Sequence, residues 1–252
     1  MKGRGCWPGL ISLGSAVRIR PSLPNFMKQK YRFLIQRIFY YIYGEKFYKR
    51  LNYNWKGLPS RTDIIQKIIN LKNFKSYLEI GCDNDENFSK IQINKKVGVD
   101  PLKGGTLRET SDEFFNKNKD DFDIIFLDGL HTYEQTIKDI DNSLRYLNDN
   151  GVILVHDCLP KKIWNQIVPR MYGHWNGDVW KAIVHSRTYD HVDTYTCTVD
   201  HGLGVIFKRK NKDKLQLSIK NFKDLKFADY FNKHQIFMKP INHLELEKFF
   251  TN

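Results

Sequence analysis

Acids, histidines and one glycine follow four short apolar segments of this sequence, at the point where each segment ends. They are Glu79 and Gly81 at the end of the first segment, Asp100 after the second, Asp128 and His131 after the third, and His156 and Asp157 after the fourth. Carboxylates and imidazoles that lie close together can bind a cation, coordinate a divalent metal or move a proton. We therefore predict one reaction centre where these segments end.

The elements that must position these residues are apolar runs alternating with helical patterns. Strands are predicted at 76–80, 96–99, 122–127 and 152–155, with a weaker one at 106–108. Helices are predicted at 61–72, from 111 through 115 and at 132–147, with Ser60 and Ser111 as N-caps and a turn at 148–151. Strands that alternate with helices favour a parallel sheet covered on both faces, which binds ligands at the carboxyl ends of its strands.

The loop after the first predicted strand favours a cationic ligand. Residues 79–86 contain four acids, no base and one glycine, and Asp100 follows Gly81 by 19 positions, where an acid can bind ribose hydroxyls. A pyrophosphate needs a glycine-rich loop without nearby anions, since one like-charge contact at about 4 Å costs about 4 kcal/mol. S-adenosylmethionine carries an ammonium and a sulfonium and no phosphate, so the loop favours it over a dinucleotide.

Asp128 and Asp157 end neighbouring predicted strands, which lie about 4.8 Å apart in a sheet. Two carboxylates at that spacing can share a divalent cation, and oxygen ligands suit Mg²⁺ or a similar hard ion. Such a metal would bind substrate hydroxyls and lower their pKa. His131, at the start of a helix, can accept the hydroxyl proton. The simpler alternatives are a turn residue for Asp128, a backbone-bonded helix start for His131 and structural loop positions for His156 and Asp157.

Five segments resemble the class I S-adenosylmethionine-dependent methyltransferases, and more closely the sugar and small-molecule O-methyltransferases called methyltransferase family 24. The segments are residues 77–81, 97–101, 122–133, 151–157 and 200–206. The resemblance covers about residues 60–208. It implies a Rossmann-like three-layer α/β sandwich whose seven-stranded sheet is mostly parallel with an antiparallel last strand, residues 192–199 and 203–208 being the final two strands.

The same resemblance implies the roles of individual residues. Glu79 and Gly81 would flank the methionine portion of the cofactor, Asp100 would hold the ribose, and Ser111 and Asp112 would lie near the adenine. Asp83 and Asp128 are also assigned to the cofactor site. Related metal-dependent enzymes have acids at the positions of Asp128 and Asp157 and often one at His156, which makes these three the predicted metal ligands. Asp85 stands where relatives usually have a second glycine, and Asp tolerates left-handed backbone better than most residues.

The charge of the 252-residue chain, +13 in total, is concentrated near its beginning. Residues 1–60 hold twelve Lys and Arg against one acid, Glu45, so the rest is nearly neutral and a nucleic-acid-binding function is disfavoured. The four cysteines are far apart and form no CxxC pair, which argues against a zinc ribbon or a disulfide scaffold and favours a reducing cytoplasm. No apolar run is long enough to predict a membrane-spanning helix.

The pattern divides the chain into four parts. Residues 1–26 are rich in Gly and Pro, and we interpret them as a disordered or mis-annotated extension before a true start at Met27. Residues 27–59 form a basic, aromatic helical segment, which either contacts an anionic membrane or glycan through residues 28–55 or packs on the main domain. Residues 60–210 form the methyltransferase domain, and residues 211–252 a C-terminal extension that packs on it or forms a dimer contact.

The predicted function is methyl transfer from S-adenosylmethionine to a hydroxyl of a sugar or another small molecule, with assistance from Mg²⁺ or another divalent cation. His131 and Asp128 are the predicted catalytic residues, and His174 and Trp175 the predicted substrate contacts. One alternative is a nucleic-acid methyltransferase, disfavoured because residues 128–131 read Asp-Gly-Leu-His instead of an Asn/Asp-Pro-Pro-aromatic motif. The other is a non-catalytic cofactor-binding or membrane-associated scaffold. The predicted partners are the small-molecule or glycan substrate and a second copy of the chain, and no specific nucleic acid.

Overall fold

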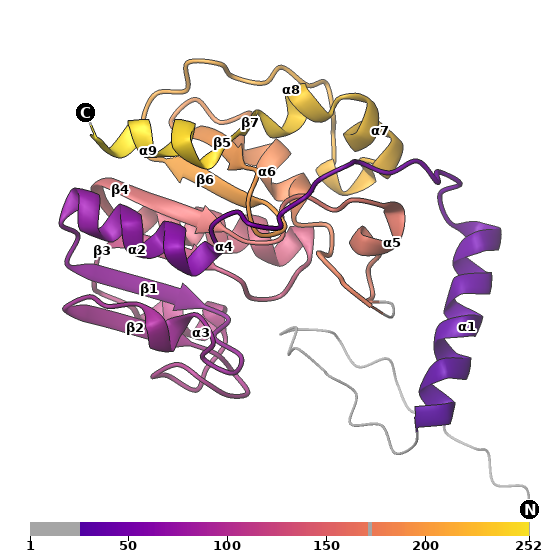
Figure 1. Cartoon of the computed structure of the whole chain (residues 1–252), viewed down its shortest axis with the longest axis horizontal. Helices are drawn as coiled ribbons and strands as arrows, with labels where there is room; N and C mark the ends of the chain where they lie inside the picture. The colour runs from indigo at the N-terminus through magenta and orange to yellow at the C-terminus, as the bar shows by residue number, and fades with distance from the viewer. Residues whose placement is uncertain (1–25, 171–172, 252) are drawn as a thin grey trace, which may run out of the picture.

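A single seven-stranded sheet forms the centre of the computed structural model, which describes residues 26–170 and 173–251 (Figure 1). Its strand order is β2-β1-β3-β4-β6-β5-β7. The strands are β1 (Ser76–Ile80), β2 (Lys95–Val99), β3 (Phe122–Leu127), β4 (Leu147–Val155), β5 (Asp193–Cys197), β6 (Leu203–Phe207) and β7 (Pro240–Ile241). Every predicted main strand is present, which confirms the mostly parallel α/β sheet.

The antiparallel strand is β6, which runs opposite to β4 on one side and to β5 on the other. It lies within the predicted range 203–208. The seventh strand, however, comes from the C-terminal segment, because β7 pairs in parallel with β5 at the sheet edge. The strand predicted at 106–108 is wrong: Leu107 makes only an isolated bridge to Val99. Gly104 and Gly105 both have positive φ angles just before it, which bends the backbone away from an extended path.

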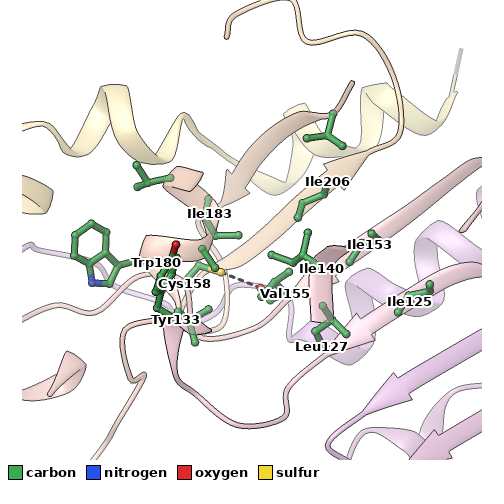
Figure 2. Close-up of a cluster of buried hydrophobic side chains, with 14 of the residues drawn as sticks. Ile125, Leu127, Tyr133, Ile140, Ile153, Val155, Cys158, Trp180, Ile183 and Ile206 are labelled. Carbon is green, nitrogen blue, oxygen red and sulfur yellow. Dashed lines mark hydrogen bonds between the residues drawn. The ribbon is translucent and has the colours of Figure 1, made fainter. Parts of the chain in front are cut away.

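Helices cover both faces of the sheet, so the domain has three layers. One face packs against α2 (Arg61–Lys72) and α9 (His243–Thr251), with Ile65 and Leu246 among the buried contacts. The other packs against α3 (Ser111–Lys117), α4 (Tyr133–Arg145) and α6 (Trp180–Ser186). Figure 2 shows this second core, where Trp180 is fully buried and the thiol of Cys158 donates to the carbonyl of Val155 at 3.1 Å.

Local signals set most element boundaries as predicted. Ser60 caps α2 and forms a reciprocal capping box with Asp63. The N-cap of α3 is Thr110, not Ser111, because the Thr110 hydroxyl accepts from the amide of Glu113 while the Glu113 carboxylate accepts from the amide of Thr110. The turn predicted at 148–151 lies inside β4 as an irregular, shifted stretch in which Asn150 has a φ of 64°.

The first helix stands apart from the sheet. Helix α1 (Phe26–Tyr43) contacts the domain through Tyr40, whose ring lies 5.5 Å from that of Trp164 in α5 (Ile163–Gln166) (Figure 1). Other apolar residues of α1, such as Ile35 and Phe39, are exposed. None of the described helices is both long and apolar enough to cross a bilayer. Membrane contact through residues 28–55 stays a prediction, and residues 1–25 lie outside the described part of the chain.

The C-terminal segment packs on the domain, one of its two predicted arrangements. It contains η2 (Phe222–Asp224), α7 (Phe227–Asn232) and α8 (His234–Met238). The other short helix, η1 (Phe88–Lys90), is not part of this segment and follows the loop after β1. Tyr230 and Phe237 are buried in the same core as α6, while Phe250 of α9 joins the core beneath α2. The segment therefore completes both hydrophobic layers.

Candidate active site

Two adjoining cavities lie at the carboxyl ends of β1, β2 and β3, and Gly81 lines both. One is a small, mostly apolar cavity lined by Ile80, Gly81, Val99, Asp100, Pro101, Thr110, Ser111, Asp112, Gly129, Leu130 and Gln135. The other is lined by Arg61, Glu79, Gly81, Cys82, Asp83, Asn84, Glu86, Asn87, Asp128, His131, His156 and Asp157, and we call it the acidic pocket. All seven predicted cofactor residues line one or the other.

Gly81 permits a close approach that no other residue allows. Its φ is +91°, and a Cβ there would lie 2.3 Å from the carbonyl oxygen of Asp128. The ends of β1 and β3 therefore come together at this glycine, leaving a cradle that a side chain would fill. This cradle joins the apolar cavity to the acidic pocket, as a nucleoside with a charged tail requires.

Glu79 is buried at the base of the acidic pocket. Its carboxylate accepts hydrogen bonds from the Tyr77 hydroxyl and from the Asn87 side-chain amide, the latter at 2.8 Å. Burial raises the pKa of Glu79 to about 7, against the lowering effect of these two hydrogen bonds. A carboxylate held this way is stabilised in its charged form by any cation that enters the pocket.

Asp100 and Asp85 hold the loops around the cavities. The Asp100 carboxylate accepts from the amides of Asp83, Leu102 and Lys103 at 2.8–3.0 Å, which leaves acceptor capacity for a ribose hydroxyl. Asp85 adopts a φ of 60°, so it takes the left-handed conformation expected of it. Its carboxylate accepts from the amide of Gly105 at 2.6 Å and does not line the acidic pocket.

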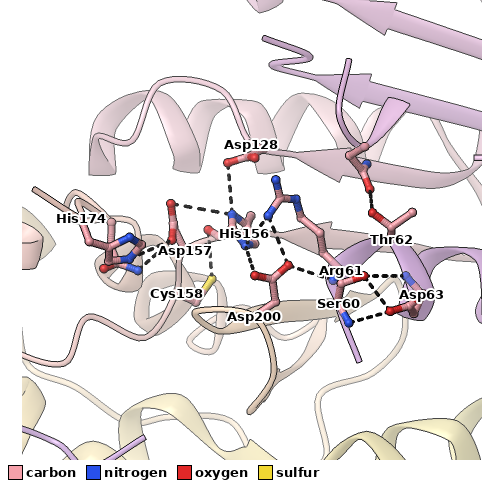
Figure 3. Close-up of polar contacts among 12 residues, drawn as sticks. Ser60, Arg61, Thr62, Asp63, Asp128, His156, Asp157, Cys158, His174 and Asp200 are labelled. Atoms are coloured by element: carbon pink, nitrogen blue, oxygen red, sulfur yellow. Dashed lines mark hydrogen bonds and ion pairs between the residues drawn. The ribbon is translucent and has the colours of Figure 1, made fainter. Parts of the chain in front are cut away.

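Asp128, His131, His156 and Asp157 come together at the ends of β3 and β4, as predicted (Figure 3 labels three of them). His131 Nε2 lies 3.1 Å from Asp128 Oδ1, and its Nδ1 lies 3.3 Å from Asp157 Oδ2. His156 Nδ1 lies 3.3 Å from the same Asp128 oxygen. Although burial alone would raise it, the two imidazoles hold the pKa of Asp128 well below its usual range. Asp128 is therefore a carboxylate that faces two imidazoles, those of His131 and His156.

His156 carries a fixed positive charge. Burial alone would lower its pKa, but the charges of Asp128 and Asp157 raise the pKa of His156 to about 10. Its Nε2 lies 3.7 Å from Asp200, which also binds the Arg61 guanidinium at 3.2 Å (Figure 3). His156 is thus the charged partner of Asp128, while His131 lies between Asp128 and Asp157.

Arg61 and Asp200 are part of this centre and were missed in the sequence. The sequence could have indicated a role for Arg61, because a cation at the first position of a helix is unfavourable next to the helix dipole unless an anion binds it. Here the reason is Asp200, which accepts from both the backbone amide and the guanidinium of Arg61. Asp200 begins the segment 200–206 that resembles the methyltransferases, but no role was assigned to it.

Two groups of side chains have the donor atoms to hold a metal ion. Asp128, His131 and Asp157 bring one ligand atom each within 4.8 Å of one another, with His131 in the place predicted for His156. His131 Nδ1 is buried and has no hydrogen-bond partner, as expected for a free metal ligand. Asp157, His174 and His201 form the second group. A nitrogen ligand beside carboxylates suits Mn²⁺, Fe²⁺ or Zn²⁺ better than Mg²⁺.

A third cavity, of about 580 Å³, opens beside Asp157, and we call it the acceptor cavity. It is lined by Arg37, Arg50, Trp55, Lys161, Lys162, Trp164, Asn165, Gly173, His174, Asn176 and His201. His174, one predicted substrate contact, lines it. Trp175, the other, instead stacks on His131 with ring centroids 5.2 Å apart and donates its indole N–H to the carbonyl of Ile167. Trp175 therefore packs against the His131 ring and holds it in position.

Comparison with known proteins gives one family match. Residues 75–158 match the family model described as a methyltransferase domain. A comparison with curated proteins gives no match.

Several solved structures resemble the chain. A putative caffeoyl-CoA O-methyltransferase from Staphylococcus aureus is 16% identical, with a TM-score of 0.44 over 72% of this chain and 99% of the other. The SAH-bound methyltransferase PaMTH1 from Podospora anserina is 16% identical, with a TM-score of 0.45 over 79% and 100%. A putative O-methyltransferase from Klebsiella pneumoniae is 13% identical, with a TM-score of 0.47 over 76% and 92%.

The fold assignment rests on the strand order, since these TM-scores are all below 0.5. The family match covers β1 to β4 and ends one residue after Asp157, so it includes all seven predicted cofactor residues. Residues 75–158 of this chain are therefore a methyltransferase domain, which confirms over that range the resemblance found in the sequence.

Proposed function

We propose that this protein transfers a methyl group from S-adenosylmethionine to a hydroxyl of a small molecule. The observation that carries the proposal is the position of the His131–Asp128 pair in the acidic pocket, separated from the lining of the acceptor cavity by the Asp157 side chain alone. An acidic pocket on one side suits a cationic donor, and the cavity on the other side has room for an acceptor.

When bound, S-adenosylmethionine supplies a methyl group on a positively charged sulfur. The small apolar cavity fits its adenosine, with Asp100 as the hydroxyl acceptor and Asp112 and Ser111 at the far wall. The carboxylates of Glu79 and Asp83 face its charged tail. Gly81 keeps the passage between the two parts open.

The chain's own residues would then prepare the acceptor oxygen. His131 takes the hydroxyl proton, and Asp128 orients the imidazole through Nε2 and stabilises the charge it gains. As the oxygen–carbon bond forms, the carbon–sulfur bond breaks and the sulfur becomes neutral. Where Asp128, His131 and Asp157 instead hold a divalent cation, the cation would supply Lewis-acid activation of the hydroxyl in place of proton transfer to His131. Trp175 and the surrounding core keep water from His131, which is mostly buried.

Calorimetric titration of the purified protein with S-adenosylmethionine, its demethylated product and NAD tests the donor. We expect the first two to bind and NAD not to bind, because five carboxylates and only two cations, Arg61 and His156, line the acidic pocket and would repel its phosphates. Tight binding of NAD without binding of the sulfonium donor would contradict the proposal.

A methyl-transfer screen over hydroxylated compounds, run with and without a chelator and with Asp157→Ala, tests the metal. We expect the chelator and the substitution to lower turnover together. Activity that neither one changes would remove the metal from the proposal and leave His131 as the sole activator.

A further inference from the structure

The acceptor cavity has a strongly basic lining. Arg37, Arg50, Lys161 and Lys162 contribute four cations, and no acid lines it. Within residues 26–170 and 173–251, none of these four side chains forms an ion pair with a carboxylate, whereas surface lysines such as Lys95 and Lys138 do. Cations that gather around a cavity without counter-charges raise its potential and favour an anionic ligand.

Flat rings stand among these cations. Lys161 Nζ lies 4.0 Å from the centroid of the Trp55 ring, and the Arg37 guanidinium lies 5.6 Å from that of Trp164. The Trp55 ring in turn lies 4.4 Å from the His201 ring. An aromatic face beside a cation offers an apolar surface for the C–H face of a sugar ring and a charge for a group attached to that ring.

The floor of the cavity connects to the reaction centre. The Asn176 side-chain amide donates to Asp157 Oδ1 at 2.9 Å, and His174 Nε2 lies 3.9 Å from the same oxygen. Asp157 Oδ2 lies 3.3 Å from His131 Nδ1. Asp157 therefore links the lining of this cavity to the His131 imidazole, so a ligand hydroxyl against Asn176 and His174 would lie one side chain away from His131.

We propose that the acceptor is an anionic carbohydrate, bound with its ring between Trp55 and Trp164 and its phosphate or carboxylate against Arg50, Lys161 and Lys162. This inference rests on the proposed function, because it names the acceptor of that reaction. The volume of about 580 Å³ lies within the range of small-molecule sites and leaves room for a sugar with a charged substituent.

Calorimetry with three probes tests the inference on the full chain, saturated with S-adenosylhomocysteine so that no transfer occurs. The probes are glucose 1-phosphate, glucuronic acid and glucose. We expect at least one anionic probe to bind at least about tenfold more tightly than glucose, with an affinity that falls as salt rises. The preferred anion identifies the charged group as phosphate or carboxylate.

A triple variant, Arg50→Gln with Lys161→Gln and Lys162→Gln, removes the rim charges. We expect it to weaken binding of the preferred anion at least about tenfold and to leave binding of glucose unchanged. The matched control, Lys119→Gln with Lys210→Gln and Lys212→Gln, removes three exposed charges away from the cavity, and we expect no effect on either probe.

Two outcomes overturn the inference: equal affinity for glucose and both anions, or equal losses of affinity in the two triple variants. Binding of S-adenosylhomocysteine is measured in the same samples and decides the proposed function separately. If the protein binds this nucleoside but no anionic sugar, the proposed function stands and the inferred acceptor is wrong. If it binds an anionic sugar but not the nucleoside, the proposed function is wrong.

Discussion

The acidic pocket and the acceptor cavity lie on either side of Asp157, which lines the pocket and accepts a hydrogen bond from Asn176 of the cavity, and the two sites carry opposite charge. Five carboxylates line the acidic pocket, against Arg61 and the protonated His156, whereas four cations and no acid line the acceptor cavity. A cationic donor and an anionic acceptor would each be repelled from the other's site. The opposite charges of the two sites would therefore direct the donor to the acidic pocket and the acceptor to the acceptor cavity.

The two regions also come from different parts of the chain. Apart from Arg61, every residue that lines the apolar cavity or the acidic pocket lies within the matched residues 75–158. Every residue that lines the acceptor cavity lies outside this range, in α1, in the segment after it, in 161–176 or at His201. The proposed donor site thus lies almost entirely within the matched residues, and the proposed acceptor site lies outside them.

Substitution at the junction should have the largest effect. His131→Gln keeps a hydrogen-bond donor for Asp128 but cannot take a proton, so we expect kcat to fall about 10²- to 10⁴-fold. Affinity for S-adenosylhomocysteine and for the acceptor should stay within about twofold, since glutamine puts a polar side chain of similar size at this one position of the acidic pocket and leaves the other lining residues in place. Single-turnover assays and calorimetry measure the two quantities.

His191→Gln is the matched control, because His191 is exposed and stacks only on Tyr189 among the described ring contacts. It should leave kcat unchanged. If His131→Gln weakened ligand binding as much as turnover, His131 would belong to one of the two binding sites and not to the junction.

Closing the passage at Gly81 should disable the donor side alone. Gly81→Ala places a methyl group 2.3 Å from a backbone oxygen, so we expect affinity for S-adenosylmethionine to fall at least about 100-fold. The control is Gly57→Ala, which has a similar φ of +78° and nothing within 4 Å of the added carbon. Circular dichroism checks that both variants are folded, and unchanged binding by Gly81→Ala would show that the cradle is not the donor site.

The donor side was predictable from sequence because its signals are local. Glu79, Gly81, Asp100 and Asp128 each end a strand whose apolar pattern is continuous, and parallel strands bring their carboxyl ends to one edge. The N-cap of α3 was missed by one residue, since Thr110 and Ser111 are both good caps and only the partner acid at Glu113 decides between them.

The acceptor side was not predictable as a site. Arg50, Lys161 and His201 are far apart in sequence, and only tertiary packing brings them around one cavity. The composition of residues 28–55 shows that this segment is basic and aromatic. It does not show which surface of the molecule the segment faces. The seventh strand was also misplaced, because Pro240–Ile241 is too short to show a pattern, and its place is fixed by pairing with β5.

The burial of Glu79 in the acidic pocket makes the free energy of unfolding fall as pH rises. Folding raises the pKa of Glu79 from 4.5 to about 7, so the folded protein holds a proton that the unfolded chain releases between these values. The stabilisation is complete below pH 4.5 and is lost as pH rises through 7. We expect the free energy of unfolding to fall by about 3 kcal/mol more in the wild type than in Glu79→Gln between pH 4.5 and 8.

Denaturant titration at the two pH values measures this difference, with other titrating groups cancelling between the two proteins. Saturating S-adenosylmethionine at pH 8 should narrow the gap, because a cation in the acidic pocket stabilises the ionised carboxylate. The same pH dependence in both proteins would show that Glu79 is already paired in the folded state without the donor.

The smallest effect is expected at Asp85, which borders the acidic pocket without lining it. Asp85→Gly relieves the cost of a left-handed backbone, about 1 kcal/mol, and removes the hydrogen bond to the Gly105 amide, also about 1 kcal/mol, so the two changes nearly cancel. We expect affinity for S-adenosylmethionine to change less than about threefold. Asp85→Ala keeps the strain and loses the bond, so denaturant titration should find it the less stable of the two. If Asp85→Gly changed the affinity for S-adenosylmethionine by more than about tenfold, the Asp85 carboxylate would turn toward the donor. The acidic pocket would then contain one more carboxylate than the residues that line it in this structure.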